Sequence, residues 1–192
     1  MELKDIEKYA SEYKIPIMQE EGLEFLLQYI EENNITKILE IGAAIGYSAI
    51  RMALLRPDIR VVTVEREQER YQEAVNNIKA FGLEKQIRIY HMDAFDLELD
   101  EQFDFIFIDA AKAQYTKFFE KFKKNLKVGG TILSDNLNFH GLTEDPEQIK
   151  SKNLRSLVRK INAYREFLKE NQEFETKFYD LGDGIAVSIK KG

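Results

Sequence analysis

Apolar and polar positions alternate in blocks along this chain of 192 residues, and their period changes from block to block. Short apolar runs, typical of strands buried on both faces, are separated by stretches with the 3.6-residue spacing of amphipathic helices. The predicted strands cover residues 37–41, 60–64, 86–90, 103–108, 129–134, 174–181 and 184–190. The predicted helices cover residues 47–55, 67–81, 112–125 and 149–170, and two further helices fill the first 34 residues with a break at Ile15–Pro16.

The alternation of strand-like and helix-like segments predicts a parallel sheet with helices on both of its faces. This pattern is typical of the Rossmann-like, doubly wound α/β class. Gly82 follows the helix expected over 67–81 and is a natural end for it. Gly182, Asp183 and Gly184 separate the last two apolar runs and indicate a β-hairpin. No repeat or Gly/Ser/Pro-rich linker interrupts the chain, so residues 1–192 are expected to form a single domain.

Composition and charge exclude several classes of protein. Apolar residues make up 44% and charged residues 32% of the chain, as in ordinary globular domains. No apolar run approaches the roughly 20 residues that a membrane-spanning helix needs, and the charged N-terminus MELKDIEKYA is unlike a signal peptide. The absence of cysteine excludes disulfides and thiolate catalysis, so a cytoplasmic protein with no membrane contact is expected. The net charge of −6 argues against nonspecific nucleic-acid binding over the whole surface but allows a local basic patch.

Ligands of this fold class bind at the carboxyl ends of the strands. The first such end, EIGAAIGYSA at 40–49, contains a glycine turn. A dinucleotide fold needs GxGxxG, but counted from Gly42 the second and third glycine positions hold Ala44 and Tyr47, so NAD and FAD are disfavoured. Glu40, directly before the loop, would repel a pyrophosphate and attract a cationic ligand. A tight turn that holds no ligand is the alternative.

Acidic residues also follow the next two strands. Glu65 ends the second strand, where a carboxylate can accept hydrogen bonds from both ribose hydroxyls of an adenosine. Glu65 could instead cap the helix that begins near Glu67. Asp93 and Ala94 follow the third strand, where an adenine ring would lie. An adenosine ligand that is cationic and carries no phosphate fits these positions, and S-adenosylmethionine matches that description.

Two carboxylates and a carboxamide follow the fourth and fifth strands, at Asp109, Asp135 and Asn136. Mg²⁺ accepts such oxygen ligands, with water and substrate oxygens completing its octahedron. Taken singly, Asp109 is more typical of a helix N-cap and Asp135–Asn136 of a turn. Their joint position after neighbouring strands favours a metal site. A cation beside Lys112 would favour the neutral amine, so Lys112 could act as a general base.

Five segments resemble one family in combination: ILEIGAAIGYSAIRMA, VVTVERE, FIDAAKAQY, ILSDNL and DGIAVSIK. They resemble the class I, metal-dependent O-methyltransferases of the catechol and caffeoyl-CoA type, over essentially the full chain. The resemblance implies a seven-stranded sheet, mostly parallel with an antiparallel last strand, extra N-terminal helices and a homodimer. The S-adenosylmethionine contacts that it implies are Met18, Glu40, Gly42, Ser48, Glu65, Asp93, Ala94 and Asp109. The Mg²⁺ ligands that it implies are Asp109, Asp135 and Asn136, and the base is Lys112.

Within that family the likeness is greatest to the bacterial tRNA 5-hydroxyuridine methyltransferases, through YKIPIM, GAAIGYSAIRMA and NLRSLVRKI. Residues 150–169 hold seven basic side chains against one acid, Glu166. On a helix, the apolar face of this stretch comprises Leu154, Leu157, Ile161, Tyr164 and Leu168, with Lys152, Arg155 and Arg159 opposite. Such a charged face is most often only solvated. If it binds tRNA, Arg155, Arg159 and Lys160 would hold the phosphates.

The substrate is the least constrained prediction. A 5-hydroxyuridine suits the metal site because its 5-hydroxyl and 4-carbonyl oxygens can chelate a cation as a catechol does. The loop Asn138–His140 departs from the family pattern, and His140 is expected to line the substrate pocket. The alternative substrate is a small catechol-like or acyl-CoA phenol, which would not need the basic helix. A regulatory nucleotide-binding module without catalysis would not explain the metal residues and Lys112 together.

Two groups of apolar side chains are interpreted as packing. Phe118, Phe119 and Phe122 recur at helical spacing and are assigned to the core. Leu23, Leu26, Leu27 and Ile30 form a stripe on the second N-terminal helix. This stripe is more typical of a core than of a dimer interface, so the expected homodimer depends mainly on the family resemblance.

Overall fold

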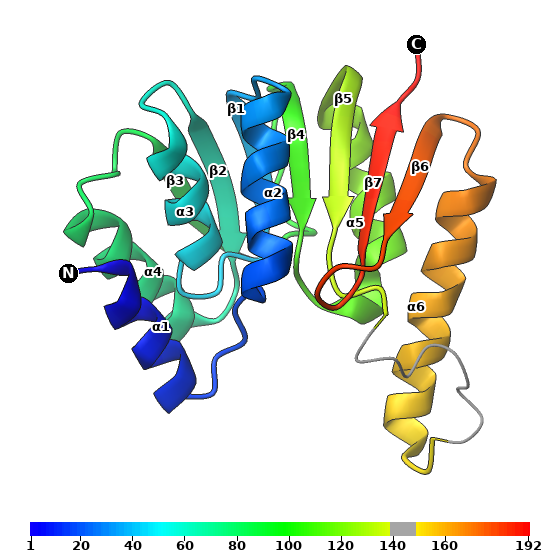
Figure 1. Cartoon of the computed structure of the whole chain (residues 1–192), viewed down its shortest axis with the longest axis horizontal. Helices are drawn as coiled ribbons and strands as arrows, with labels where there is room; N and C mark the ends of the chain where they lie inside the picture. The colour runs from blue at the N-terminus through cyan, green and yellow to red at the C-terminus, as the bar shows by residue number, and fades with distance from the viewer. Residues whose placement is uncertain (139–148) are drawn as a thin grey trace.

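A seven-stranded sheet runs through the middle of the protein, in the order β3-β2-β1-β4-β5-β7-β6 (Figure 1). The computed structural model describes residues 1–138 and 149–192. The strands are β1 (Lys37–Ile41), β2 (Arg60–Glu65), β3 (Ile87–His91), β4 (Phe103–Ile108), β5 (Leu126–Ser134), β6 (Phe174–Tyr179) and β7 (Ile185–Lys190). Strands β1 to β5 pair in parallel, whereas β7 pairs antiparallel with both β5 and β6. The predicted sheet, mostly parallel with an antiparallel last strand, is confirmed.

Helices cover both faces of the sheet. They are α1 (Leu3–Glu12), α2 (Glu20–Glu32), α3 (Tyr47–Leu55), α4 (Gln68–Ala80), α5 (Tyr115–Phe122) and α6 (Lys152–Glu170). Ile38 and Phe105 belong to the core that α1 to α4 close on one face, while Leu39 and Ile106 belong to the core under α5 and α6. Neighbouring residues of one strand therefore pack in opposite cores, which explains why apolar residues follow one another directly in these strands.

Helix boundaries differ from the prediction by one residue at each end of α4 and more clearly in two other places. The segment 112–125 is helical throughout, but single 3-10 turns at Lys112–Gln114 and Lys123–Asn125 flank α5. The helix expected from residue 149 begins at Lys152, because the Ser151 side chain accepts a hydrogen bond from the backbone N–H of Leu154 (3.4 Å) and caps it.

The apolar stripe of α2 is used inside the chain. Leu23, Leu26 and Ile30 are buried in the core that α2 shares with the sheet, and Leu27 packs partly buried against the same core. The stripe therefore adds no support for a dimer, and the homodimer stays a prediction from the family resemblance.

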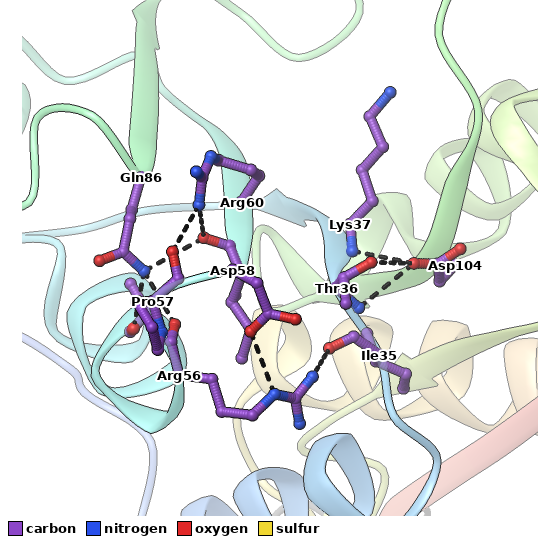
Figure 2. Close-up of polar contacts among 11 residues, drawn as sticks. Ile35, Thr36, Lys37, Arg56, Pro57, Asp58, Arg60, Gln86 and Asp104 are labelled. Atoms are coloured by element: carbon purple, nitrogen blue, oxygen red, sulfur yellow. Dashed lines mark hydrogen bonds and ion pairs between the residues drawn. The ribbon is translucent and has the colours of Figure 1, made fainter.

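The amino-terminal edge of the sheet is closed by polar contacts to backbone groups (Figure 2). One carboxylate oxygen of Asp104 accepts hydrogen bonds from the backbone N–H groups of Thr36 and Lys37 and from the Thr36 hydroxyl. The Gln86 amide donates to three backbone carbonyls, including that of Arg56 (3.0 Å). These bonds tie the start of β1 and the loop before β2 to neighbouring segments of the chain.

The opposite edge carries the carboxyl ends of the parallel strands, with the loops that the sequence marks for chemistry (Figure 1). Ligands of open α/β sheets bind outside these carboxyl ends. Within residues 1–138 and 149–192, no helix is long and apolar enough to cross a membrane.

Candidate active site

A cavity of about 990 Å³ opens at the carboxyl edge of the sheet. Its walls come from the loops after β1 to β5, from the segment between α1 and α2, and from the turn between β6 and β7. It brings together most of the predicted site residues, namely Met18, Gly42, Ser48, Glu65, Asp93, Ala94, Asp109, Lys112, Asp135 and Asn136. Glu40 and the arginines and lysines of α6 do not line it. His140 lies outside the described residues.

The glycine turn after β1 brings two parts of the cavity together. Gly42 has a φ of +102°, and a β-carbon there would lie 2.4 Å from the backbone oxygen of Asp109. Gly46 has a φ of +82° and precedes α3, where a β-carbon would lie 3.3 Å from that of Ala74. The turn therefore needs glycine at both positions for close approach, first to the end of β4 and then to α4.

Glu40 lies beneath the cavity and is fully buried. Its two carboxylate oxygens accept hydrogen bonds from the hydroxyls of Ser48 (2.5 Å) and Thr63 (2.6 Å). Burial raises the pKa of Glu40 from 4.5 to about 7, although these two hydrogen bonds lower it. Glu40 does not line the cavity, because both oxygens are directed to neighbouring hydroxyls, and its contact with the cofactor stays a prediction. Ser48 lines the cavity in its place.

Glu65 braces two loops and also faces the cavity. One oxygen accepts a hydrogen bond from the backbone N–H of Ala44 (2.9 Å), and the other accepts one from Glu67 (2.9 Å), the residue that precedes α4. The N-cap residue of α4 is Glu67, and no side chain caps the helix, so the capping role considered for Glu65 is limited to this contact with the residue before α4. Each carboxylate oxygen has a second lone pair, so the Glu65 side chain can still accept hydrogen bonds from ribose hydroxyls.

Asp93 shapes the loop after β3. Its Oδ1 accepts a hydrogen bond from the backbone N–H of Phe95 (2.9 Å), and its Oδ2 lies 3.8 Å from the Arg66 guanidinium. This local bond fixes the course of the loop and the direction in which Phe95 leaves it. Phe95 lies in the cavity wall beside Ala94.

Asp109, Asp135 and Asn136 form one cluster at the ends of β4 and β5. The side-chain amide of Asn136 donates to both carboxylates, at 3.3 Å to Asp109 and 2.9 Å to Asp135. Burial and the nearby charge of Asp109 raise the pKa of Asp135 from 3.8 to about 7. Burial also raises the pKa of Asp109, while the charge of Lys112 lowers it. Two carboxylates held together away from water need a cation or a proton between them.

This cluster fits a hard divalent cation. Two carboxylates and one carboxamide are suitable protein ligands for Mg²⁺, which keeps several positions for water or substrate oxygens. The Asn136 amide can present its oxygen to a cation by rotating about its terminal bond, since the two amide atoms occupy similar positions. Within the described part of the chain, no group of three or more His, Cys, Asp or Glu side chains could hold a metal, so a cation bound here would have to use the Asn136 carboxamide as well.

Several residues of the wall were not predicted from the sequence, among them Phe95, Phe118 and Asp183. Phe118, assigned to the core, is nearly buried but also lines the cavity. Asp183, assigned only to a hairpin turn, lines it as well, and its backbone oxygen accepts a hydrogen bond from the backbone N–H of Asn138 (2.7 Å). The hairpin signal predicted the turn at Asp183, but no local pattern indicated that it would contact the segment after β5.

The basic helix α6 is only partly available to a ligand. Arg155 is half-buried and donates two hydrogen bonds to the backbone oxygen of Ile149, which leaves less of its guanidinium for a phosphate, and its phosphate contact stays a prediction. Arg165 donates to the backbone oxygen of Leu137 and to the Asn138 side chain. Arg159 and Lys160 are exposed. Val158, absent from the expected apolar face, completes that face.

Comparison with known proteins agrees with this geometry. Residues 2–191 match the family described as O-methyltransferase. The flavonoid 3',5'-methyltransferase of Vitis vinifera is 30% identical over 190 residues, covering 94% of this chain and 80% of that protein. The caffeoyl-CoA O-methyltransferase of Populus kitakamiensis is 27% identical over 189 residues, covering 94% and 80%.

Two solved structures are also similar. A Staphylococcus aureus protein described as a "putative caffeoyl-CoA O-methyltransferase" has a TM-score of 0.95 and 37% identity, covering 99% of this chain and 92% of that one. An O-methyltransferase of Bacillus cereus, solved in complex with S-adenosylhomocysteine, has a TM-score of 0.84 and 26% identity, covering 98% and 90%. The chain belongs to the O-methyltransferase family of the caffeoyl-CoA type. It is an S-adenosylmethionine-dependent O-methyltransferase.

Proposed function

We propose that this enzyme methylates the 5-hydroxyl of 5-hydroxyuridine in a tRNA anticodon loop, with Mg²⁺ at Asp109, Asp135 and Asn136 and Lys112 as the base. The observation that carries the RNA substrate is the position of α6. Figure 1 shows the N-terminal turns of this helix extending past the carboxyl ends of the parallel strands, at the edge where the cavity opens. Lys152, Arg159 and Lys160 are exposed on these turns.

The cofactor is proposed to lie across the ends of β1, β2 and β3. Glu65 would accept hydrogen bonds from the ribose hydroxyls, while Asp93 and Ala94 would border the adenine. The loop from Gly42 to Ser48 would hold the methionine part, which places the sulfonium toward Asp109. The Bacillus cereus neighbour in complex with S-adenosylhomocysteine supports a cofactor of this kind.

The methyl transfer would take place at the end of the cavity formed by Asp109, Lys112, Asp135 and Asn136. A Mg²⁺ ion bound there would supply a Lewis acid that lowers the pKa of the substrate hydroxyl. Lys112 would take the hydroxyl proton, and the oxygen would attack the methyl carbon in line as the carbon–sulfur bond breaks, leaving S-adenosylhomocysteine. Positive charge on sulfur is lost in this step, so a cavity that excludes water favours it.

The acceptor has a second candidate. The relatives named for caffeoyl-CoA and flavonoids favour a phenol with two neighbouring oxygens. Such an acceptor would use the same metal and the same base, but it would not need the charge of α6. The salt dependence of the methylation rate therefore distinguishes a tRNA acceptor from a phenol, because phosphate contacts weaken steeply as salt rises.

The deciding measurement is nucleoside mass spectrometry of tRNA from cells with and without the gene. The proposal expects 5-methoxyuridine to disappear and 5-hydroxyuridine to accumulate when the gene is absent. An unchanged amount of 5-methoxyuridine in tRNA would refute the RNA acceptor and favour a phenol as the substrate.

A charge-removal variant tests the helix itself. Lys152→Ala/Arg159→Ala/Lys160→Ala should lower kcat/KM for tRNA about tenfold or more at low salt. The matched control, Lys79→Ala/Lys85→Ala/Lys191→Ala, removes three exposed charges from the opposite edge and should leave the rate within about twofold. Equal activity of the first variant and the wild type on tRNA would argue against RNA binding by α6.

A further inference from the structure

Phe95 exposes an aromatic ring in the cavity wall. Within the described residues six large apolar side chains are exposed, and Phe95 (37% exposed) is the one of them that lines the cavity. Exposed aromatic rings are costly to leave in water, and those in a cavity are candidates for contact with a flat ligand.

The ring of Phe95 is held in place by a neighbouring aromatic ring and by a hydrogen bond of its own backbone. It stacks on Phe118, with ring centroids 4.7 Å apart and an interplanar angle of 15°. Phe118 is only 5% exposed and packs in the core under α5 and α6, so it is a firm support. The hydrogen bond from the Phe95 N–H to Asp93 fixes the backbone at the point where the ring departs. The platform is therefore formed before a ligand arrives.

We propose that Phe95, supported by Phe118, is the platform on which the adenine of S-adenosylmethionine stacks. The inference rests on the cofactor placement given above, in which Asp93 and Ala94 border the adenine. Phe95 is the next residue along the chain and lines the same wall. Stacking on an aromatic side chain is independent of the hydrogen-bonding edge of the base, so the platform would add affinity without competing with contacts in the plane of the ring.

Calorimetry with two ligands tests the platform. S-adenosylhomocysteine carries the base, and S-ribosylhomocysteine has the same sugar and amino acid without it. Phe95→Ala should weaken S-adenosylhomocysteine about tenfold or more. It should leave S-ribosylhomocysteine, measured by competition at millimolar concentration, within about twofold of the wild type. Phe95→Tyr keeps the aromatic face and should keep both affinities within about twofold.

Three results would overturn the platform. One is unchanged affinity of Phe95→Ala for S-adenosylhomocysteine. Another is equal weakening of both ligands, which would mean that the cavity itself had changed shape. The third is an equal loss in Leu54→Ala, a control at an exposed apolar residue of α3 that does not line the cavity.

Two further results concern the proposals on which the platform depends. Failure of the wild type to bind S-adenosylhomocysteine would overturn both the cofactor placement and the platform. Absence of tRNA methylation would refute the RNA acceptor and leave the platform in place, so the two failures are distinguishable.

Discussion

The backbone of Gly42 lies against the backbone oxygen of Asp109, so closely that a β-carbon at residue 42 would stand 2.4 Å from it. This approach connects the turn that borders the cofactor with the carboxylate proposed to hold the metal. Parallel pairing of β1 with β4 makes the approach possible, because it places the carboxyl ends of the two strands side by side.

Gly42→Ala should weaken S-adenosylhomocysteine binding at least tenfold, because the backbone must move away from Asp109 and its φ of +102° disfavours any β-carbon. The matched control is Gly82→Ala. Gly82 also has a positive φ (+68°), but nothing lies within 4 Å of its β-carbon position, so the control should cost only about 1 kcal/mol of stability. Calorimetry and thermal melting measure both effects, and equal binding by the two variants would contradict the role of this contact.

Asp135→Ala should abolish turnover while changing the affinity for S-adenosylhomocysteine by no more than a few fold. The Asp135 carboxylate lies with Asp109 and Asn136 at the end of the cavity assigned to the metal. Isothermal titration with the cofactor product and a separate titration with Mg²⁺ measure the two functions independently. Full activity of the wild-type enzyme in excess EDTA would refute the metal.

Lys112→Met should lower kcat by a factor of about 100 or more, in the range of general base catalysis. Methionine retains most of the length of the side chain but cannot accept a proton. Binding of S-adenosylhomocysteine and Mg²⁺ should stay close to the wild-type values. If the pH–rate profile of the variant were the same as that of the wild type, Lys112 would have no part in proton transfer.

Stability should fall as the pH rises from about 5 to 8. The folded protein holds a proton on Glu40 with a pKa of about 7, whereas the unfolded chain has the ordinary value of 4.5. The folded state therefore binds more protons in this interval, and ionisation of the buried group costs about 3 kcal/mol by pH 8. Asp135, whose pKa is also raised to about 7, adds to the same slope.

Glu40→Gln should make this slope shallower, because glutamine does not ionise and can still bond to Ser48 and Thr63. Chemical denaturation at pH 5.5 and pH 8 measures the change. The variant should lose less stability between the two pH values than the wild type. An identical slope in both proteins would mean that Glu40 stays ionised in the fold.

The strand-helix alternation and the position of the ligand edge were readable from the sequence. Buried parallel strands must be apolar on both faces, so their runs stand out, and the polar residues that interrupt them mark the strand ends. Gly42, Glu65, Asp93, Asp109, Asp135 and Asn136 were found in this way, and all of them line one cavity.

Other features depend on which segments the sheet order brings together. Glu40 precedes the glycine turn, yet the pairing of β1 with β2 places Thr63 beside it and turns its carboxylate inward. Phe118 has the spacing of a core residue, and only the approach of the loop after β3 gives it a place in the wall. Periodicity reports which face of an element is buried. Contacts between residues far apart in the chain depend on strand order and loop course, which local patterns do not contain.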